Sequence, residues 1–165
     1  MIVDQGNNKF LNYLSGNRCV FTMPDLTSTS FTINGFELPP ISLPPAIQPS
    51  PLIMMPTHGE TLTYDDLTLE FLVMESLENW LELHSWIRAL GFPEKSQEFK
   101  NRTLTNIDGY ATIYSSHNNP IIRFKFINVI PIQLGGITFS ESIDETTTVM
   151  SSITLSYERY DIEKI

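Results

Sequence analysis

The residues that could bind a metal ion or attack a substrate are few and widely separated. The three histidines, His58, His84 and His117, form no HxH, HxxxH or HExxH pattern, so they lack the spacing of metal ligands on one element. Asp65 and Asp66 are adjacent, whereas a calcium loop needs alternating oxygen ligands. The single cysteine, Cys19, lies in the apolar stretch RCVF, which favours an inert buried thiol over a nucleophile. The sequence therefore predicts no metal site and no cofactor.

The motifs of common enzyme classes are also missing from the sequence. There is no GxSxG nucleophile elbow, no phosphate-binding loop and no GxGxxG dinucleotide motif. Pairs of carboxylates are numerous, as in any acidic chain, but the sequence does not indicate which of them face each other. We therefore expect a protein that is not an enzyme.

The charge of the chain restricts its partners. The sequence has 19 acidic and 10 basic residues, a net charge of -9, which argues against a protein that coats nucleic acid. Charged residues make up 18% of the chain, below the roughly 25% of soluble domains, so neighbouring copies could cover part of the surface. Seven acids lie between Glu60 and Glu82 without a Lys or Arg, whereas basic residues gather at 95–102 and 123–125. This pattern suits head-to-tail contact between copies, or simply solvated faces.

The length of 165 residues fits one domain. Residues 1–17 are polar and Asn-rich, and we interpret them as an N-terminal arm that precedes a single domain over 18–165. No apolar run approaches the roughly 20 residues of a membrane span, and the first residues lack the order of a signal peptide. We expect no membrane association.

Alternating apolar and polar residues predict a mainly β, α+β fold: an antiparallel sandwich or barrel with one flanking helix at about 76–90. Ser76 is the expected N-cap of that helix, and Gly91 and Pro93 follow its end. Trp86 lies off the expected apolar stripe of the helix, so we expect it to meet a partner or a covering loop. The predicted strands are 18–23, 29–36, 62–73, 109–115, 121–129, 137–139 and 147–160.

A proline-rich stretch at 39–56 contains seven of the eleven prolines. Proline lacks the N–H that a helix or central strand needs, so the stretch must be extended. It also carries many apolar side chains, which suits chain lying in a groove of the same subunit or of a neighbour. The candidate subunit-interface residues are Pro39, Ile41, Leu43, Ile47, Leu52, Met54, Met55 and Trp86.

The order of features at 37–90 resembles the tail-tube-like proteins of contractile-tailed phages. In that family a segment of the type LPGI.LP leads to G..LTYD.LT..F.VDE.L.N, and here ELPPISLPP leads to HGETLTYDDLTLEFLVMESLEN. The matching positions include Gly59, Leu62–Asp65, Leu67-Thr68, Phe71, Leu77, Asn79 and Trp86. Met74-Glu75-Ser76 departs from the commoner Val-Asp-Glu. The C-terminal strands match in order as well, so the resemblance covers about residues 18–160.

This resemblance implies a structural virion protein that assembles in the host cytoplasm into a ring, a hexamer in the family, with a continuous inner β wall. The compact length and the proline-rich stretch are most similar to the tail terminator, which caps the tube at the neck. Its partners would be further copies and adjacent tube, sheath or neck proteins, and DNA would pass through the lumen without specific binding. We expect 147–160 and the 121–129 hairpin to form the wall, with Ser152, Thr154, Ser156 and Glu158 facing the lumen.

Other functions remain open at this point. The main tube subunit and a baseplate-proximal tube initiator share the fold expected for the terminator. Two alternatives come from other classes, namely the ring protein of a bacterial secretion system and a small-molecule-binding β barrel. The barrel predicts a monomer with an apolar cavity, whereas the ring predicts a filled core and exposed strand edges.

Overall fold

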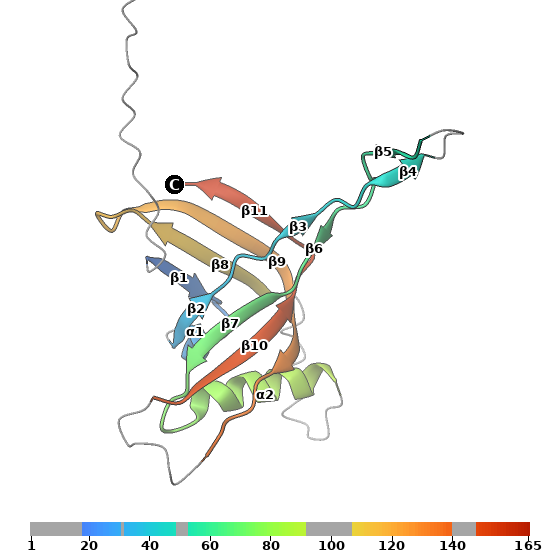
Figure 1. Cartoon of the computed structure of the whole chain (residues 1–165). Helices are drawn as coiled ribbons and strands as arrows, with labels where there is room; N and C mark the ends of the chain where they lie inside the picture. Colours follow the sequence, from blue (N-terminus) through green and yellow to red (C-terminus); the bar gives the residue numbers. More distant parts are fainter. Residues whose placement is uncertain (1–17, 31, 49–52, 92–106, 140–147) are drawn as a thin grey trace, which may run out of the picture.

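The computed structural model describes residues 18–30, 32–48, 53–91, 107–139 and 148–165. The predicted N-terminal arm at 1–17, the basic cluster at 95–102 and the candidate interface residue Leu52 therefore lie outside the described residues. Within the described part the chain forms a mostly antiparallel β structure with two helices, which confirms the predicted fold class (Figure 1).

One seven-stranded sheet forms the body, in the order β1-β8-β9-β10-β7-β2, with β11 also pairing β9. All pairings are antiparallel, and two short two-stranded ladders, β3-β6 and β4-β5, lie outside this sheet. The strands of the body are β1 (Cys19–Thr22), β2 (Ile33–Phe36), β7 (Leu67–Leu72), β8 (Ile107–Tyr114), β9 (Pro120–Leu134), β10 (Met150–Ser156) and β11 (Arg159–Lys164).

The long strand β9 divides this sheet into two halves. Its first part pairs β8 and β11, and its second part, Ile130–Leu134, pairs β10. Between the two parts Asn128 has a φ of 55°, a left-handed conformation that bends the strand. We call β1, β8, β11 and the first part of β9 the charged half-sheet. The second part of β9 with β10, β7 and β2 is the hydroxyl half-sheet.

The two half-sheets fold over a single core. Phe21 and Phe126 come from the charged half-sheet, and Phe71 and Ile153 come from the hydroxyl half-sheet, all with almost no exposed surface. Phe21 also lies 5.6 Å from Phe36 of β2, ring centroid to centroid, so the two ends of the sheet approach each other. The burial of these aromatic and aliphatic side chains supplies the main stabilisation of the body.

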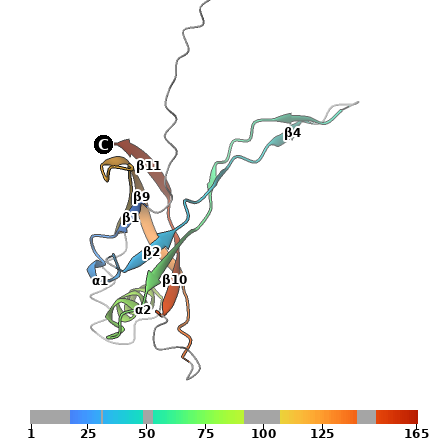
Figure 2. The same ribbon diagram turned by 60° about the vertical axis from the view of Figure 1, so that its left-hand side comes forward.

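The helix α2 (Glu78–Leu90) lies across one end of the sheet (Figure 2). The predicted helix is confirmed, but its start and its buried face were wrong. Leu77, in a left-handed conformation, occupies the N-cap without a side-chain cap, so Ser76 does not cap the helix. The apolar stripe expected from helical spacing was Leu77, Trp80, Leu81, His84, Ile87 and Leu90. The buried side chains are instead Asn79, Leu83, Trp86 and Ala89, and Leu81 is exposed.

Asn79 performs the capping role from inside the helix. Its Oδ1 accepts hydrogen bonds from the N–H groups of Met74 (3.2 Å) and Trp80 (2.9 Å). Its Nδ2 donates to Thr32 Oγ1 (2.9 Å) and to the carbonyl of Leu72 (2.7 Å). One buried amide therefore ties the start of α2 to the end of β7, and every hydrogen-bonding group of its side chain is used.

Four strand predictions differ from the structure. The predicted strand at 62–73 is two strands, because Thr63–Tyr64 (β6) pairs Ile41–Ser42 (β3) and only Leu67–Leu72 (β7) joins the body. The predicted strand at 29–36 begins with a short helix, α1 (Thr27–Ser30), and only then continues as β2. Residues 137–139 form no strand, because β9 runs through Pro131 and ends at Leu134. The predicted strand at 147–160 is two strands, since β10 ends at Ser156 and pairs the second part of β9, whereas β11 begins at Arg159 and pairs the first part.

Residues 37–48 and 53–64 form an arm that leaves the body between β2 and β7 (Figures 1 and 2). The arm consists of β3 (Ile41–Ser42) paired with β6 (Thr63–Tyr64), and β4 (Ala46–Gln48) paired with β5 (Met55–Thr57). The described residues of the proline-rich stretch, 39–48 and 53–56, are thus extended as predicted, and they run outward from the body and back. Among the described residues no helix could span a membrane.

Candidate assembly surfaces

The outward face of the hydroxyl half-sheet is lined by small polar side chains. On β10, Ser152, Thr154 and Ser156 alternate with the buried Ser151, Ile153 and Leu155, so the three predicted lumen residues do share one face. On β7, Thr68 and Glu70 face the same way, because Thr68 pairs Thr154 and Glu70 pairs Ser152 in register. This face therefore presents hydroxyl groups, the carboxylate of Glu70 and the exposed side chain of Met150, and Glu37 lines a hollow together with Thr68 and Glu70.

Glu158 does not belong to this row. It lies in the turn between β10 and β11, where its Oε2 accepts a hydrogen bond from Asn128 Nδ2 at 2.5 Å. Its other carboxylate oxygen pairs with Arg159 Nη1 at 2.9 Å. The expectation that Glu158 continues the row assumed an unbroken strand, and the turn after Ser156 removes that periodicity.

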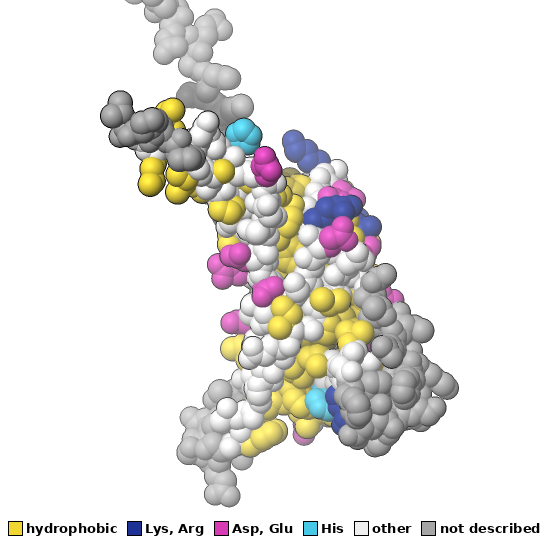
Figure 3. Space-filling model, turned by 90° about the vertical axis from the view of Figure 1, so that its right-hand side faces the viewer, with side chains coloured by type: hydrophobic (Ala, Val, Ile, Leu, Met, Phe, Trp, Pro, Cys, Tyr) yellow, Lys and Arg dark blue, Asp and Glu magenta, His cyan; other side chains and the backbone are white. Residues whose placement is uncertain are grey.

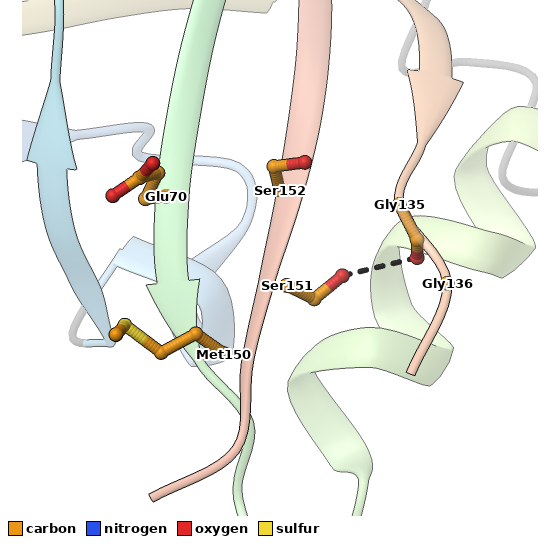
Figure 4. A pocket seen from close by; sticks show the side chains of 6 residues that line it. All are labelled: Glu70, Gly135, Gly136, Met150, Ser151 and Ser152. Carbon is orange, nitrogen blue, oxygen red and sulfur yellow. Dashed lines mark hydrogen bonds between the residues drawn. The ribbon is translucent and has the colours of Figure 1, made fainter. Parts of the chain in front are cut away.

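Glu70 was not among the predicted lumen residues, although the alternation in LTLEFL placed it on a polar strand face. It lines a hollow of about 320 Å³ with Gly135, Gly136, Met150, Ser151 and Ser152 (Figure 4). Ser151 Oγ donates to the carbonyl of Gly135 at 3.0 Å, and Gly135 N donates to the carbonyl of Ser152 at 2.6 Å. A Cβ at Gly135 would lie 2.9 Å from that Ser152 oxygen, so this approach of β9 to β10 requires glycine.

The two outer strands of the hydroxyl half-sheet have unpaired edges within the described residues. One edge is β2, which pairs only β7. The other is the second part of β9, which pairs β10 on one side, while β8 and β11 stop alongside its first part. Ile130 and Ile132 are exposed along this part of β9. Unpaired, apolar strand edges are the surfaces by which sheets join between molecules.

The arm exposes most of its apolar side chains (Figure 3). Ile41 and Leu43 are about half exposed, and Ile47, Met54 and Met55 near the tip are more so, up to 73% for Met54. No charged residue lies between Glu37 and Glu60. Of the predicted interface residues, Pro39 is buried at the root of the arm. Trp86 is 1% exposed and belongs to the core, so its expected contact with a partner is withdrawn.

A cluster of aromatic rings joins the root of the arm to the body. Tyr64 of β6 contacts Tyr157 and Tyr160 at 5.9 and 5.5 Å between ring centroids, and Phe126 contacts Tyr157 at 5.1 Å. Burial raises the pKa of Tyr157 to about 12. The Tyr157 hydroxyl is buried and finds no hydrogen-bond partner among the described residues.

The outward face of the charged half-sheet carries matched opposite charges. Lys125 Nζ lies 3.1 Å from Asp108, and this hydrogen-bonded ion pair raises the pKa of Lys125. Arg159 contacts Asp161 at 3.6 Å, and Arg123 stands opposite Glu163 in the ladder of β9 and β11.

In the part of the chain that the structure covers, no group of three or more His, Cys, Asp or Glu side chains could hold a metal ion.

Comparison with solved structures gives similarity over nearly the whole chain. A chain from the anti-feeding prophage cap, described as the tube terminating cap, has a TM-score of 0.71 at 14% identity, covering 100% of both chains. A chain of the PVC sheath-tube complex, from an extracellular contractile injection system in the extended state, has a TM-score of 0.69 at 14% identity, covering 93% of both.

A more distant similarity is to the Hcp1 protein of E. coli EAEC 042, with a TM-score of 0.50 at 8% identity, covering 90% of this chain and 99% of that chain. No protein-family model and no curated protein matches the sequence. At these identities the similarity establishes the fold and not the role. The chain therefore has the tail-tube-like fold that proteins of contractile injection systems share.

Proposed function

We propose that this protein is a non-catalytic structural subunit that forms a closed ring, and that it is the terminator that caps the tube of a contractile phage tail at its neck. The observation that carries the ring is the hydroxyl half-sheet, which has an unpaired edge at each side and a polar outward face. Pairing of β2 in one copy with the second part of β9 in the next satisfies both edges. Such head-to-tail contacts form a closed ring when the rotations between successive copies add up to one full turn.

The hydroxyl half-sheet then lines the lumen. Its outward face presents the hydroxyls of Thr68, Ser152, Thr154 and Ser156 and the carboxylate of Glu70, without a Lys or Arg. A face of this kind has no cation to hold phosphate groups, so DNA would pass without specific binding. The previously expected 121–129 segment is left out of this lining, because it belongs to the charged half-sheet.

The position within the assembly is proposed from the similar solved structures. The anti-feeding prophage cap supports a terminator, and the PVC sheath-tube chain, with a nearly equal TM-score, keeps the main tube subunit as a second candidate. The Hcp1 similarity keeps a secretion-system tube as a further alternative. A hexameric ring, contacts with sheath and neck proteins and location in a virion belong to the same proposal.

The ring is tested with two matched substitutions. Ile132 on the free edge of β9 and Leu81 on α2 are both 52% exposed, so a lysine at either site should change monomer stability by less than about 0.5 kcal/mol. Ile132→Lys is expected to abolish ring formation, because it places a charge where a neighbouring strand must pair. Leu81→Lys is expected to leave it intact.

Negative-stain microscopy and sedimentation velocity measure ring formation, and circular dichroism confirms that both variants fold. Wild-type protein that remains monomeric at high concentration contradicts the ring. Rings formed equally by both variants would show that this edge of β9 is not the contact.

A further inference from the structure

An apolar groove opens beside the end of the sheet where β1 approaches β2. It measures about 420 Å³ and is lined by Cys19, Val20, Met23, Pro24 and Ile33, together with polar residues whose hydroxyls are already bonded. Ser30 Oγ accepts a hydrogen bond of 2.8 Å from the N–H of Met23 and donates one to a backbone carbonyl. Thr22 Oγ1 donates to the carbonyl of Tyr110 at 3.5 Å. The groove therefore offers an occupant apolar contact, with neither a charge nor a spare hydrogen bond.

The arm has the complementary character. Its tip carries Ile47, Ile53, Met54 and Met55, all more than half exposed, in a stretch without a charged residue. This stretch stands out in a chain with a net charge of -9. Exposed apolar surface on this scale indicates a contact with another molecule, because leaving it in water costs free energy.

The arm cannot deliver its tip to the groove of its own chain. The pairings β3-β6 and β4-β5 hold it extended, and Gly59 packs so closely on Pro44 that a Cβ there would lie 1.8 Å from the Pro44 carbonyl oxygen. In both views the arm points away from the side of the body that carries β1 and α1 (Figures 1 and 2). Only another copy can therefore bring an arm tip to this groove.

We propose that the arm tip of one copy inserts into the β1–β2 groove of a neighbouring copy, with the two methionines filling it. Methionine suits this role because its flexible thioether adapts to irregular apolar space. The groove and the tip lie on opposite sides of each copy, so the contact is head-to-tail and each copy both gives and receives an arm. This inference rests on the proposed assembly of copies, and it names the acceptor surface for the arm.

The native Cys19 provides a direct test, since it is the sole cysteine and lines the groove. In the full chain, Met54→Cys places a thiol on the arm tip in addition to the thiol of Cys19 in the groove. A short bismaleimide is then added to assembled protein to cross-link thiols that lie close together. We expect a ladder of covalent dimers and higher multimers on denaturing gels, because each copy carries one donor and one acceptor. Met54→Cys with Cys19→Ser should give dimers at most. Thr138→Cys, at an exposed position outside the arm, should give no ladder.

A second variant tests the groove itself. Val20 is 46% exposed, so Val20→Asp should preserve the fold by circular dichroism while its carboxylate makes the groove unfavourable for an apolar tip. We expect the Met54→Cys ladder to be lost in Val20→Asp and kept in Val20→Ile.

The outcomes separate this inference from the ring. Rings in the microscope without a Met54→Cys ladder overturn the arm contact and leave the ring standing. Monomers without a ladder overturn both. No ladder in the full chain, with a ladder that appears once residues 1–17 are deleted, would assign the groove to that segment and overturn the arm contact.

Discussion

At the residue scale, Tyr157 is a polar side chain in an apolar environment that does not satisfy its hydroxyl group. Its ring packs on Phe126 and Tyr64, but its hydroxyl is buried without a partner among the described residues. A buried hydroxyl without a hydrogen bond costs about 1–3 kcal/mol. Tyr157→Phe keeps the ring and removes the hydroxyl, so we expect the free energy of unfolding at pH 8 to be unchanged or higher by about 1 kcal/mol.

The same substitution should change the response to alkali. The folded chain holds the Tyr157 proton up to about pH 12, whereas an unfolded tyrosine releases its proton near pH 10. Between these values the unfolded state binds fewer protons, so the wild type loses stability as the pH rises, by about 2 kcal/mol from this group.

Urea denaturation at pH 8 and pH 11.5 measures the effect, with Tyr114→Phe as a control outside the cluster. The wild type and the control should lose stability in parallel, and Tyr157→Phe should lose less. An equal loss in all three proteins would show that Tyr157 is not the responsible group.

At the element scale, local patterns predicted strands well where one face is buried. Alternation within 62–73 predicted β7, where Thr68 and Glu70 are exposed between buried residues, but it missed that Thr63–Tyr64 forms the separate strand β6. The predicted strand 109–115 corresponds to β8. The break at Tyr157-Glu158 was missed, because it is defined by pairing: β10 lies between β7 and the second part of β9, whereas β11 pairs the first part of β9. The face of α2 was mispredicted because Asn79 counts as polar in a pattern, yet its four hydrogen bonds let it be buried.

The candidate surfaces also divide into residues that local alternation predicts and residues that only strand pairing reveals. Ser152, Thr154 and Ser156 were predictable from one strand's alternation, whereas Glu70 required the pairing of β7 with β10. The arm was predictable as extended and apolar from its prolines. That it forms a hairpin depends on pairings between residues up to 23 positions apart, such as Ile41 and Tyr64, which carry no local signal.

The arm depends on the close packing of Gly59 against Pro44. Gly59→Ala would place a methyl group against the Pro44 carbonyl, so the two strands of the arm must separate there. We expect the body to keep its melting temperature within a few degrees, because Gly59 lies outside the core, and we expect assembly to be lost. Gly136→Ala is the control, since a Cβ there meets no atom within 4 Å.

Circular dichroism melts measure the melting temperature, and sedimentation velocity measures assembly. Normal assembly of Gly59→Ala would mean that the shape of the arm does not matter for the contact between copies.

At the scale of the whole molecule, the question is whether charge or apolar contact holds copies together. Opposed acidic and basic faces were one interpretation of the sequence. In the described residues, however, Lys125, Arg123 and Arg159 stand beside or opposite acids, and of the basic residues in the strands of the charged half-sheet only Lys164 lies opposite an apolar residue, Ile122. Each copy carries a net charge of -9, and bringing copies together therefore costs electrostatic free energy.

Ionic strength separates the two interpretations. Raising the salt concentration from about 0.01 M to 0.1 M shortens the Debye length from about 30 to 10 Å and screens repulsion between copies. If apolar edges and arms hold the ring, assembly measured by sedimentation velocity should strengthen over this range, by several-fold in the association constant. If opposed charged faces hold it, rings should dissociate as salt is added. Ile132→Lys sharpens the comparison, because it removes an apolar edge contact while lowering the net negative charge, and only the apolar interpretation expects it to prevent assembly at both salt concentrations.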